Sequence, residues 1–205
     1  DGMKSSHFDL YYLYSNTRAI IINDENAIEK AEILREKGTN RSQFYRGQVA
    51  KYNWVDFGDS YLQSDLNAAY LWAQLEKAEL INENRLATWN KYLKSFEKLA
   101  QKETIELPTI PDGCKHNAHM FYIKCKSLET RQSYINFMKE NGILCVFHYV
   151  PLHSAPAGIK YGEFNGRDEY TTLESDRLVR LPMYYNIKKE DQDKVILKTI
   201  EFFEK

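Results

Sequence analysis

The chain has 205 residues, of which 43% are hydrophobic and 28% charged, and it carries 28 basic against 29 acidic side chains. This composition excludes a disordered, collagen-like or low-complexity chain, and the length predicts one domain or one and a half. A net charge of −1 argues against a nucleic-acid surface built on bulk charge, and no run reaches the roughly 18 apolar residues that a membrane helix needs. We therefore expect a soluble globular protein that binds neither nucleic acid nor membrane.

The three cysteines, at 114, 125 and 145, are odd in number and have no metal-ligand spacing. A disulfide framework needs pairs in an oxidising compartment, so we expect reduced, mostly buried thiols and a cytoplasmic location. The sequence begins at Asp1 rather than at a methionine, and residues 1–18 show no regular period. This start is typical of the interior of a longer protein.

The first predicted elements lie between residues 19 and 58. A short apolar run at 19–22 predicts a buried strand, and a helix follows with its cap near Asp24 and its end at Gly38. From Gly38 to Gly58 the sequence follows neither helical nor strand periodicity and mixes aromatic side chains with hydrogen-bond donors. Because long structureless loops in compact domains are usually functional or disordered, we expect an ordered loop held by a ligand or a second subunit.

Residues 64–102 predict one long helix that begins at a Ser64 cap. The run 66–75 is apolar nearly all round and should be buried, whereas the later part keeps a single apolar stripe. A straight helix of this length would span ~50 Å at 1.5 Å per residue, so we expect a bend or break near 82–84. Such a helix suits a connection between residues 1–63 and a second domain at 103–205.

The last hundred residues predict an α/β fold class. The expected elements are a strand at 120–126, a helix from about 131 to 142, an apolar central strand at 143–150, a loop of about twenty residues, a short helix near 175–180, a strand at 181–185 and an amphipathic helix at 195–203. Together they form a small α/β plait.

His148 is the first candidate for chemistry. It ends the predicted central strand and precedes a long loop, which is where open α/β sheets bind ligands. Its imidazole could bond a substrate oxygen or move a proton, and the alternative is a buried histidine bonded to a backbone carbonyl. A metal site shared with His153 lacks a third ligand.

Three further side chains are weaker candidates. His119 lies three residues after His116, just before the first strand of the second domain, where a structural or capping role is the alternative. Arg41 and Arg46 lie in the 38–58 loop, where forked guanidinium bonds could clamp a phosphate or carboxylate, or the side chains could simply be solvated. The dinucleotide, P-loop, serine-hydrolase and zinc-protease motifs are absent from the sequence.

Five segments, in chain order, resemble the C-terminal half of the DegT/StrS-type sugar-nucleotide aminotransferases. They are residues 27–44, 61–69, 119–122, 148–153 and 180–185. The resemblance implies the C-terminal small domain of a fold type I transferase that depends on pyridoxal phosphate. Residues 1–63 would then be a remnant of the large cofactor-binding domain, and residues 64–102 the connecting helix.

The resemblance also implies an activity and a set of site residues. Such enzymes convert a nucleotide-linked 4-keto-6-deoxy sugar to its 4-amino sugar, usually with glutamate as the amino donor, and work as homodimers. His148 and Tyr149 would line the sugar pocket, with His153 and His119 nearby. Arg41 and Arg46 would approach the neighbouring subunit's site.

Two positions depart from the family pattern. The lysine that forms a Schiff base with the cofactor is replaced by Leu10, so we expect this chain alone to be inactive. Leu62 occupies the position that reaches the neighbour's cofactor phosphate, so Ser60 or Ser64 would have to make that contact. The alternative to an enzyme is a non-catalytic truncated module for nucleotide-sugar binding or subunit association. Such a truncation should expose apolar surface at 66–75.

Overall fold

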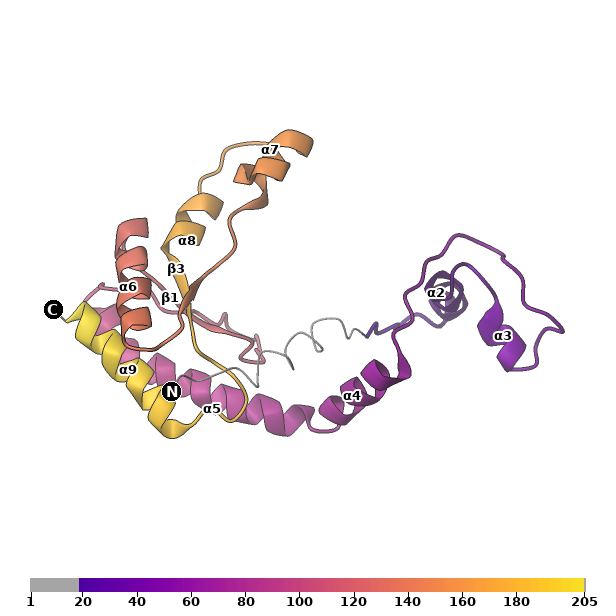
Figure 1. Cartoon of the computed structure of the whole chain (residues 1–205), viewed down its shortest axis with the longest axis horizontal. Coiled ribbons are helices and arrows are strands. Elements are labelled where there is room, and N and C mark those ends of the chain that lie inside the picture. The colour runs from indigo at the N-terminus through magenta and orange to yellow at the C-terminus, as the bar shows by residue number, and fades with distance from the viewer. Residues whose placement is uncertain (1–18, 205) are drawn as a thin grey trace. The chain divides into compact units, whose positions relative to one another are not determined.

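The computed structural model describes residues 19–204, so the predicted lysine position at Leu10 lies outside the described residues. The chain divides into two compact units, residues 1–77 and 78–205, and each is described by itself (Figure 1). No helix in the described part of the chain is long and apolar enough to cross a membrane.

Unit 1 is helical in its described part. Its elements are η1 (Glu25–Ala27), α2 (Ile28–Arg35), α3 (Arg41–Tyr45) and α4 (Asp65–Leu75). The predicted cap is confirmed, because the Asp24 carboxylate accepts a 2.9 Å bond from the Asn26 amide. The strand predicted at 19–22 is wrong: Ile20 and Ile21 are 79% and 85% exposed and form no ladder with any described residue. An apolar run becomes a strand only where a neighbouring strand satisfies its backbone groups.

The 38–58 loop is ordered, as predicted, and its own backbone bonds account for much of that order. The Gly38 carbonyl accepts bonds from the amides of Val55 (2.8 Å) and Asp56 (3.1 Å), and Thr39 forms an isolated bridge with Trp54. Gly38 has a φ of 75°, and a β-carbon there would lie 1.8 Å from the Asp56 carbonyl oxygen. The close return of the chain therefore requires glycine at this position.

The single long helix predicted at 64–102 is two helices. α4 ends at Leu75 and α5 (Ala78–Gln101) begins three residues later, so the interruption lies at 76–77 and not at 82–84. Ser64 caps α4 as predicted. The predicted burial of 66–75 is wrong in this chain, since Leu66 is 84% and Trp72 67% exposed. An apolar helix is buried only where another layer covers it, and the described residues of unit 1 provide none.

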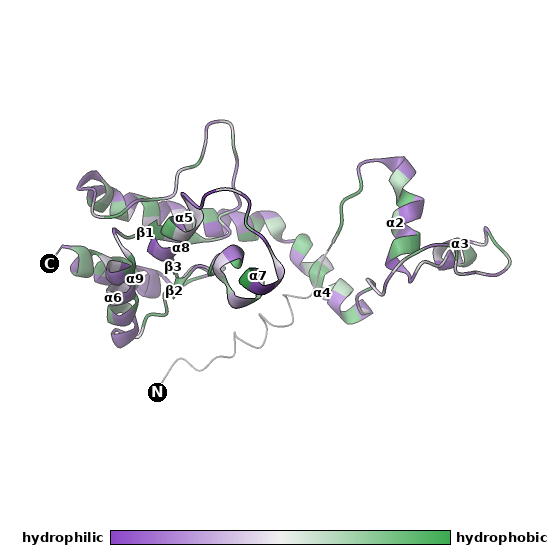
Figure 2. Ribbon diagram, turned by 90° about the horizontal axis from the view of Figure 1, so that it is seen from above, coloured by the Kyte–Doolittle hydropathy of each residue, from purple (hydrophilic) through white to green (hydrophobic). Residues whose placement is uncertain are grey.

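Unit 2 combines helices with a small sheet, in agreement with the predicted α/β class. After α5 come β1 (Phe121–Lys124), α6 (Leu128–Glu140), β2 (Val146–Phe147), η2 (Leu152–Ser154), α7 (Pro156–Tyr161), α8 (Thr171–Arg177), β3 (Leu178–Leu181) and α9 (Lys189–Phe203). The sheet is antiparallel with the order β1-β3-β2. Figure 2 shows polar and apolar residues alternating along α6 and α9, as their single buried faces require.

Two strand predictions in unit 2 are wrong, since the strand expected at 181–185 lies at Leu178–Leu181 and the one expected at 143–150 is not central. The apolar run at 143–150 forms only the two-residue edge strand β2, and its Leu144 and Val150 are exposed. A continuously apolar strand is typical of the centre of a sheet that has layers packed on both faces. In unit 2 the helices cover only one face of the sheet. The centre is β3 instead, because Leu178–Leu181 alternates in burial and pairs on both sides. The short helix predicted at 175–180 therefore ends at Arg177, and Arg180 lies in a strand.

The core of unit 2 joins α5, α6 and α9 to one face of the sheet. Its fully buried members include Tyr92, Phe96, Phe121, Ile123, Tyr134, Met138 and Val179. Cys125 and Cys145 are free and buried, as predicted, whereas Cys114 is free and exposed. Burial raises the pKa of both the Cys125 and the Cys145 thiol to about 12, so neither is a nucleophile at neutral pH.

Candidate functional site

The candidate site of unit 2 lies where β2 ends. Its members, which we call the strand-end cluster, are Arg131, His148, Tyr149 and Arg180. The sheet fixes their places: Arg180 on β3 is directly opposite Val146 of β2, and His148 follows two residues later. Arg131 comes from the first turn of α6, whose start is fixed by Ser127 capping the Thr130 amide at 3.2 Å.

His148 and Tyr149, which are consecutive in the sequence, also bring their rings into contact. Their ring centroids are 5.4 Å apart in an edge-to-face arrangement. His148 is half-buried, and its Nδ1 is sealed from solvent with no hydrogen-bond partner among the described residues. Tyr149 is exposed, and its carbonyl accepts a 2.8 Å bond from the Ser175 hydroxyl. The histidine therefore keeps one ring nitrogen uncommitted, which is what a proton-transfer or substrate-binding role needs.

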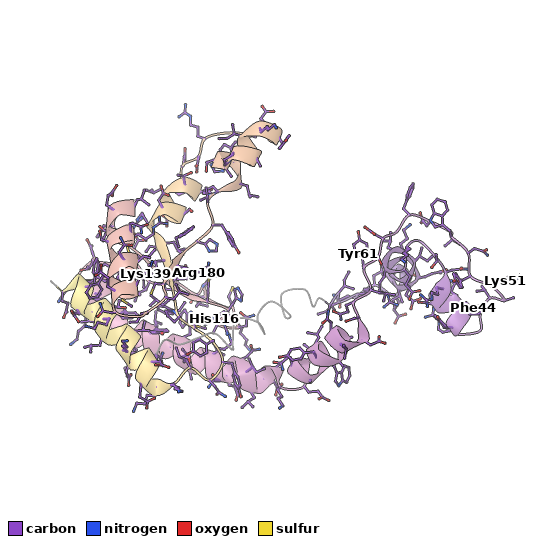
Figure 3. The ribbon with its side chains drawn as sticks, viewed as in Figure 1. Phe44, Lys51, Tyr61, His116, Lys139 and Arg180 are labelled. Carbon is purple, nitrogen blue, oxygen red and sulfur yellow. The ribbon has the colours of Figure 1, made fainter. Side chains whose placement is uncertain are left out.

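The two arginines of the cluster were not among the predicted site residues. Arg180, labelled in Figure 3, lies on β3. It donates from Nη2 to the Phe147 carbonyl at 3.3 Å, and its Cζ lies 5.8 Å from the centre of the Tyr149 ring. Arg131 is only 8% exposed, with Cζ 5.5 Å from the centre of the Phe147 ring. The alternation Leu178-Val-Arg-Leu181 is the signal that could have assigned Arg180 to a strand.

His153 lies apart from His148, in the loop that follows. Its Nε2 is 2.8 Å from the Asp168 carboxylate, and its ring centroid is 4.4 Å from that of Phe164. Asp168 also accepts a hydrogen bond from the Thr172 hydroxyl. These two bonds, with Thr172 the larger cause, lower the pKa of Asp168. The described contacts therefore make His153 part of a loop clasp with Asp168.

His119 is exposed in the segment before β1. Its carbonyl and that of Ala118 accept bonds from the Arg85 guanidinium, which ties this segment to α5. The neighbouring His116 packs its ring 4.5 Å from Trp89 and accepts a bond from the Ala118 amide. His116 thus has a structural role, and within the described part of the chain His119 makes no hydrogen bond or ring contact with the strand-end cluster.

A network of four charged groups holds α8 against β1. Lys124 bonds both Glu106 and Glu174 at 2.7 Å, and Arg177 pairs with the same two carboxylates. Hydrogen bonds from Lys124 and then Arg177 lower the pKa of Glu106. Because α8 also carries Ser175, this network helps to position the strand-end cluster.

Arg41 and Arg46 already have partners within unit 1. Arg46 makes a two-pronged pair with the Glu32 carboxylate at 2.8 and 2.7 Å, which lowers the pKa of Glu32. Arg41 donates to the Tyr45 hydroxyl at 2.6 and 3.1 Å. Arg46 would have to leave Glu32 before it could clamp a phosphate or carboxylate.

A cavity of about 370 Å³ in unit 1 lies beside Arg46. It is lined by Glu25, Ile28, Glu29, Glu32, Gln43, Arg46 and Gln48. Three carboxylates against one paired arginine make this lining unfavourable for a phosphate. Among residues 19–204, no group of three or more His, Cys, Asp or Glu side chains could hold a metal ion.

Ser60 and Ser64, the predicted cofactor contacts, lie before α4. Ser60 is exposed and forms an isolated bridge with Glu36, and the Ser64 hydroxyl oxygen accepts the Asn67 amide at 3.3 Å. Both hydroxyls can still donate to an anion. Lys30 is committed to an ion pair with Asp56. The described residues alone therefore supply hydroxyl groups but no positioned free amine, and do not by themselves fit pyridoxal phosphate.

Comparison with known proteins gives one family. The model of the DegT/DnrJ/EryC1/StrS aminotransferase family matches residues 15–199. A pleiotropic regulatory protein of Geobacillus stearothermophilus is 26% identical over 194 residues, which cover 93% of this chain and 48% of that protein. A dTDP-3-amino-3,4,6-trideoxy-alpha-D-glucose transaminase of Micromonospora megalomicea is 24% identical, with 89% and 46% covered.

Solved structures share the fold. DesV of S. venezuelae, determined in complex with a ketimine intermediate, matches with a TM-score of 0.74 and 20% identity, over 90% of this chain and 46% of its own. PseC of Helicobacter pylori, an aminotransferase of pseudoaminic acid biosynthesis, matches with a TM-score of 0.73 and 19% identity, over 89% and 47%. The chain thus spans about half the length of the relatives that it matches.

Proposed function

Because the chain belongs to the DegT/DnrJ/EryC1/StrS aminotransferase family, we propose that the protein carrying it is a sugar-nucleotide aminotransferase. It converts a nucleotide-linked 4-keto-6-deoxy sugar to the 4-amino sugar, with glutamate as amino donor and pyridoxal phosphate as cofactor. The observation that carries the proposal is the family match over residues 15–199.

The named relatives support a dTDP-linked deoxy sugar as the substrate class and pyridoxal phosphate as the cofactor. The Micromonospora relative is a transaminase named for a dTDP-linked sugar that carries its amino group at carbon 3, so the choice of carbon 4 rests on the resemblance of the five segments. A sugar aminotransferase of Streptococcus pneumoniae with the same fold has been solved in both its pyridoxal and its pyridoxamine phosphate forms. When bound, such a cofactor supplies the electron sink, and the protein supplies positioning and proton transfer.

The roles proposed for this chain's own residues follow the strand-end cluster. His148 and Tyr149 line the sugar pocket, and the free Nδ1 of His148 bonds a sugar oxygen or moves a proton at that atom. The resemblance puts His119 and His153 near this pocket, and His153 would act by holding its loop through Asp168. Tyr149 stacks against the sugar or the nucleotide.

The remaining proposed contacts belong to unit 1 and to a homodimer. Arg41 and Arg46 approach the neighbouring subunit's site, and Ser60 or Ser64 donates to the cofactor phosphate. The exposed apolar side chains of α4, Leu66 and Trp72, support association with another surface. A cytoplasmic location accords with the free thiols.

The test is amino transfer by the complete protein. It is incubated with pyridoxal phosphate, glutamate and a dTDP-linked 4-keto-6-deoxy sugar, and the product is identified by mass spectrometry. We expect the amino sugar, and a kcat at least tenfold lower in His148→Ala, with Arg167→Lys as an exposed control. A folded, cofactor-loaded protein that leaves the keto sugar unchanged contradicts the proposal.

A second candidate is carried by one observation, the leucine at position 10 where the family has its Schiff-base lysine. In that case the protein is a non-catalytic module that binds a nucleotide sugar or a partner subunit. Reading the gene upstream of Asp1 separates the two: an in-frame Ser-Phe-His-x-Thr-Lys segment favours the enzyme, and a start codon near Met3 favours the module. The 205-residue chain alone should give no visible absorbance of an internal aldimine.

A further inference from the structure

The sheet of unit 2 has one face covered by helices and one that α5, α6 and α9 leave open. Val179 and Leu181 of β3 point into the core, so Leu178 and Arg180 lie on the other face. Arg180 is at the centre of a cross-strand row, between Tyr122 of β1 and Val146 of β2. A guanidinium on the middle strand, flanked by an aromatic and an aliphatic side chain, is an unusual use of a sheet position.

The charge of Arg180 has no counter-charge nearby. Residues 19–204 place no carboxylate in salt-bridge range of it, and its guanidinium instead contacts the Phe147 carbonyl and the Tyr149 ring. The other cation of this sheet face, Lys124, is neutralised by Glu106 and Glu174. Arg180 is thus the uncompensated cation of the described sheet face.

Nitrogen atoms without partners occur on both sides of the strand end, since Arg180 lies on the open face and Arg131 lies beside Phe147, the register partner of the core-facing Val179. Arg180 Nε, His148 Nδ1 and Arg131 Nε are all sealed from solvent and without a hydrogen-bond partner in the described part of the chain. The Arg131 side chain is more than nine-tenths buried, and its Nη1 has only a long 3.4 Å bond to the Ser175 carbonyl. An unsatisfied buried N–H costs free energy, and more when the group is charged. An anionic ligand at the cluster would remove part of that cost.

We propose that Arg180, together with His148 and Tyr149, binds an oxyanion of the reactants on the open face of the sheet. The anion is a carboxylate of the amino-acid donor or a phosphate of the nucleotide, since a guanidinium fork matches both. Arg131 acts as a positioning residue that holds Phe147 and the strand end from the other side. This inference rests on the proposed function for the identity of the anions, but the binding itself needs no transamination.

The experiment observes the Arg180 Nε–H directly. Because Nε is sealed from water, its proton should exchange slowly enough to give a resolved signal in a protein labelled with ¹⁵N-arginine. Arg180→Lys identifies the signal by its disappearance. The protein is titrated at constant ionic strength with glutamate, with dTDP, and with glutaramide as the uncharged control.

We expect a saturable shift of the Arg180 signal with one of the two anions and none with glutaramide. A response to glutamate identifies the donor carboxylate, and a response to dTDP the nucleotide phosphate. Arg180→Met should weaken that binding at least tenfold, while Arg167→Met, an exposed arginine of the same unit, should leave it unchanged. Unchanged emission of the buried Trp89 verifies that each variant is folded.

The inference is overturned if neither anion moves the signal, or if folded Arg180→Met binds either anion as tightly as the unchanged protein. Its failure is distinct from failure of the proposed function. A protein that binds anions at Arg180 but transfers no amino group to the keto sugar refutes only the function. A protein that transfers the amino group with no effect of Arg180→Met refutes only the site.

Discussion

Removing Thr199 alone from its buried hydrogen bond with Tyr134 should cost more stability than removing both partners. The Tyr134 hydroxyl lies 2.8 Å from Thr199 Oγ1, and neither side chain is exposed. The pair joins α6 to α9 over the sheet that carries the strand-end cluster. Burial raises the pKa of Tyr134 well above its ordinary value, so the hydroxyl stays neutral throughout the working range.

The magnitudes follow from the partners that each variant leaves behind. In Tyr134→Phe, Thr199 Oγ1 still donates to the Val195 carbonyl at 2.7 Å, so only the net value of one bond is lost, about 1 kcal/mol. In Thr199→Val, the fully buried Tyr134 hydroxyl keeps only the weak Cys145 thiol beside it, and the cost should be about 2 kcal/mol. The double variant removes both polar groups and should be more stable than Thr199→Val alone.

The assay is urea unfolding followed by tryptophan fluorescence. Trp89 is buried in unit 2, whereas Trp54 and Trp72 are exposed in unit 1, so a Trp54→Phe, Trp72→Phe background reports on unit 2. The double-mutant cycle then gives the coupling free energy. The reasoning is refuted if the two single effects add in the double variant, or if Tyr134→Phe is the costlier change.

Three further outcomes are expected. Gly38→Ala should destabilise unit 1 by at least ~2 kcal/mol in chemical unfolding, because the added β-carbon would lie 1.8 Å from a backbone oxygen at a φ of 75°. An unchanged unfolding midpoint would show that the loop can move aside. The contact between His153 and Asp168 should be intact above the unfolded carboxyl pKa of about 4, and it should be lost as the pH falls through the lower pKa that Asp168 has in the folded protein. Limited proteolysis of the 155–167 loop should therefore be faster in acid. The same acceleration should appear at neutral pH in Asp168→Asn. Leu66→Asp and Trp72→Asp should each lower the molecular mass measured by light scattering. If the unchanged chain is already monomeric at high concentration, α4 is excluded as an association surface.

The sequence predicted those elements whose stability is local. The helix after Asp24 and the helix start at Ser64 depend on local caps, and the structure shows both caps. The strand with Phe121 and Ile123 inward and the closing helix each depend on a single buried face, which the structure also shows. The family resemblance, read from five short segments, is confirmed by the match over 15–199.

The predictions that failed depend on what lies next to a segment. The runs at 19–22 and 143–150 are apolar enough for buried strands, but the described chain gives the first no partner and the second only an edge position. The helical spacing of 64–102 could not locate the interruption at 76–77, because the apolar pattern continues on both sides of it. Whether such a segment is buried or paired depends on the layers that pack beside it, and the pattern of one sequence does not show which layers those are.

The sequence points to His148 and Tyr149, whose rings are in contact, but their role at a sugar pocket stays a prediction, as do the roles of His119 and His153. The sequence places Arg180 at a helix end, whereas the structure places it in β3. The contact of His153 with Asp168, fifteen residues away, depends on the path of the loop and has no sequence signal. The roles of Arg41, Arg46, Ser60 and Ser64 remain predictions.

The most direct test of the proposed enzyme follows the nitrogen atom itself. The complete protein is loaded with pyridoxal phosphate and given ¹⁵N-glutamate with a dTDP-linked 4-keto-6-deoxy sugar, and the sugar nucleotide is analysed by mass spectrometry. The proposal predicts a sugar product that carries ¹⁵N at the former keto carbon. A folded protein that holds the cofactor yet returns only the keto sugar would contradict it.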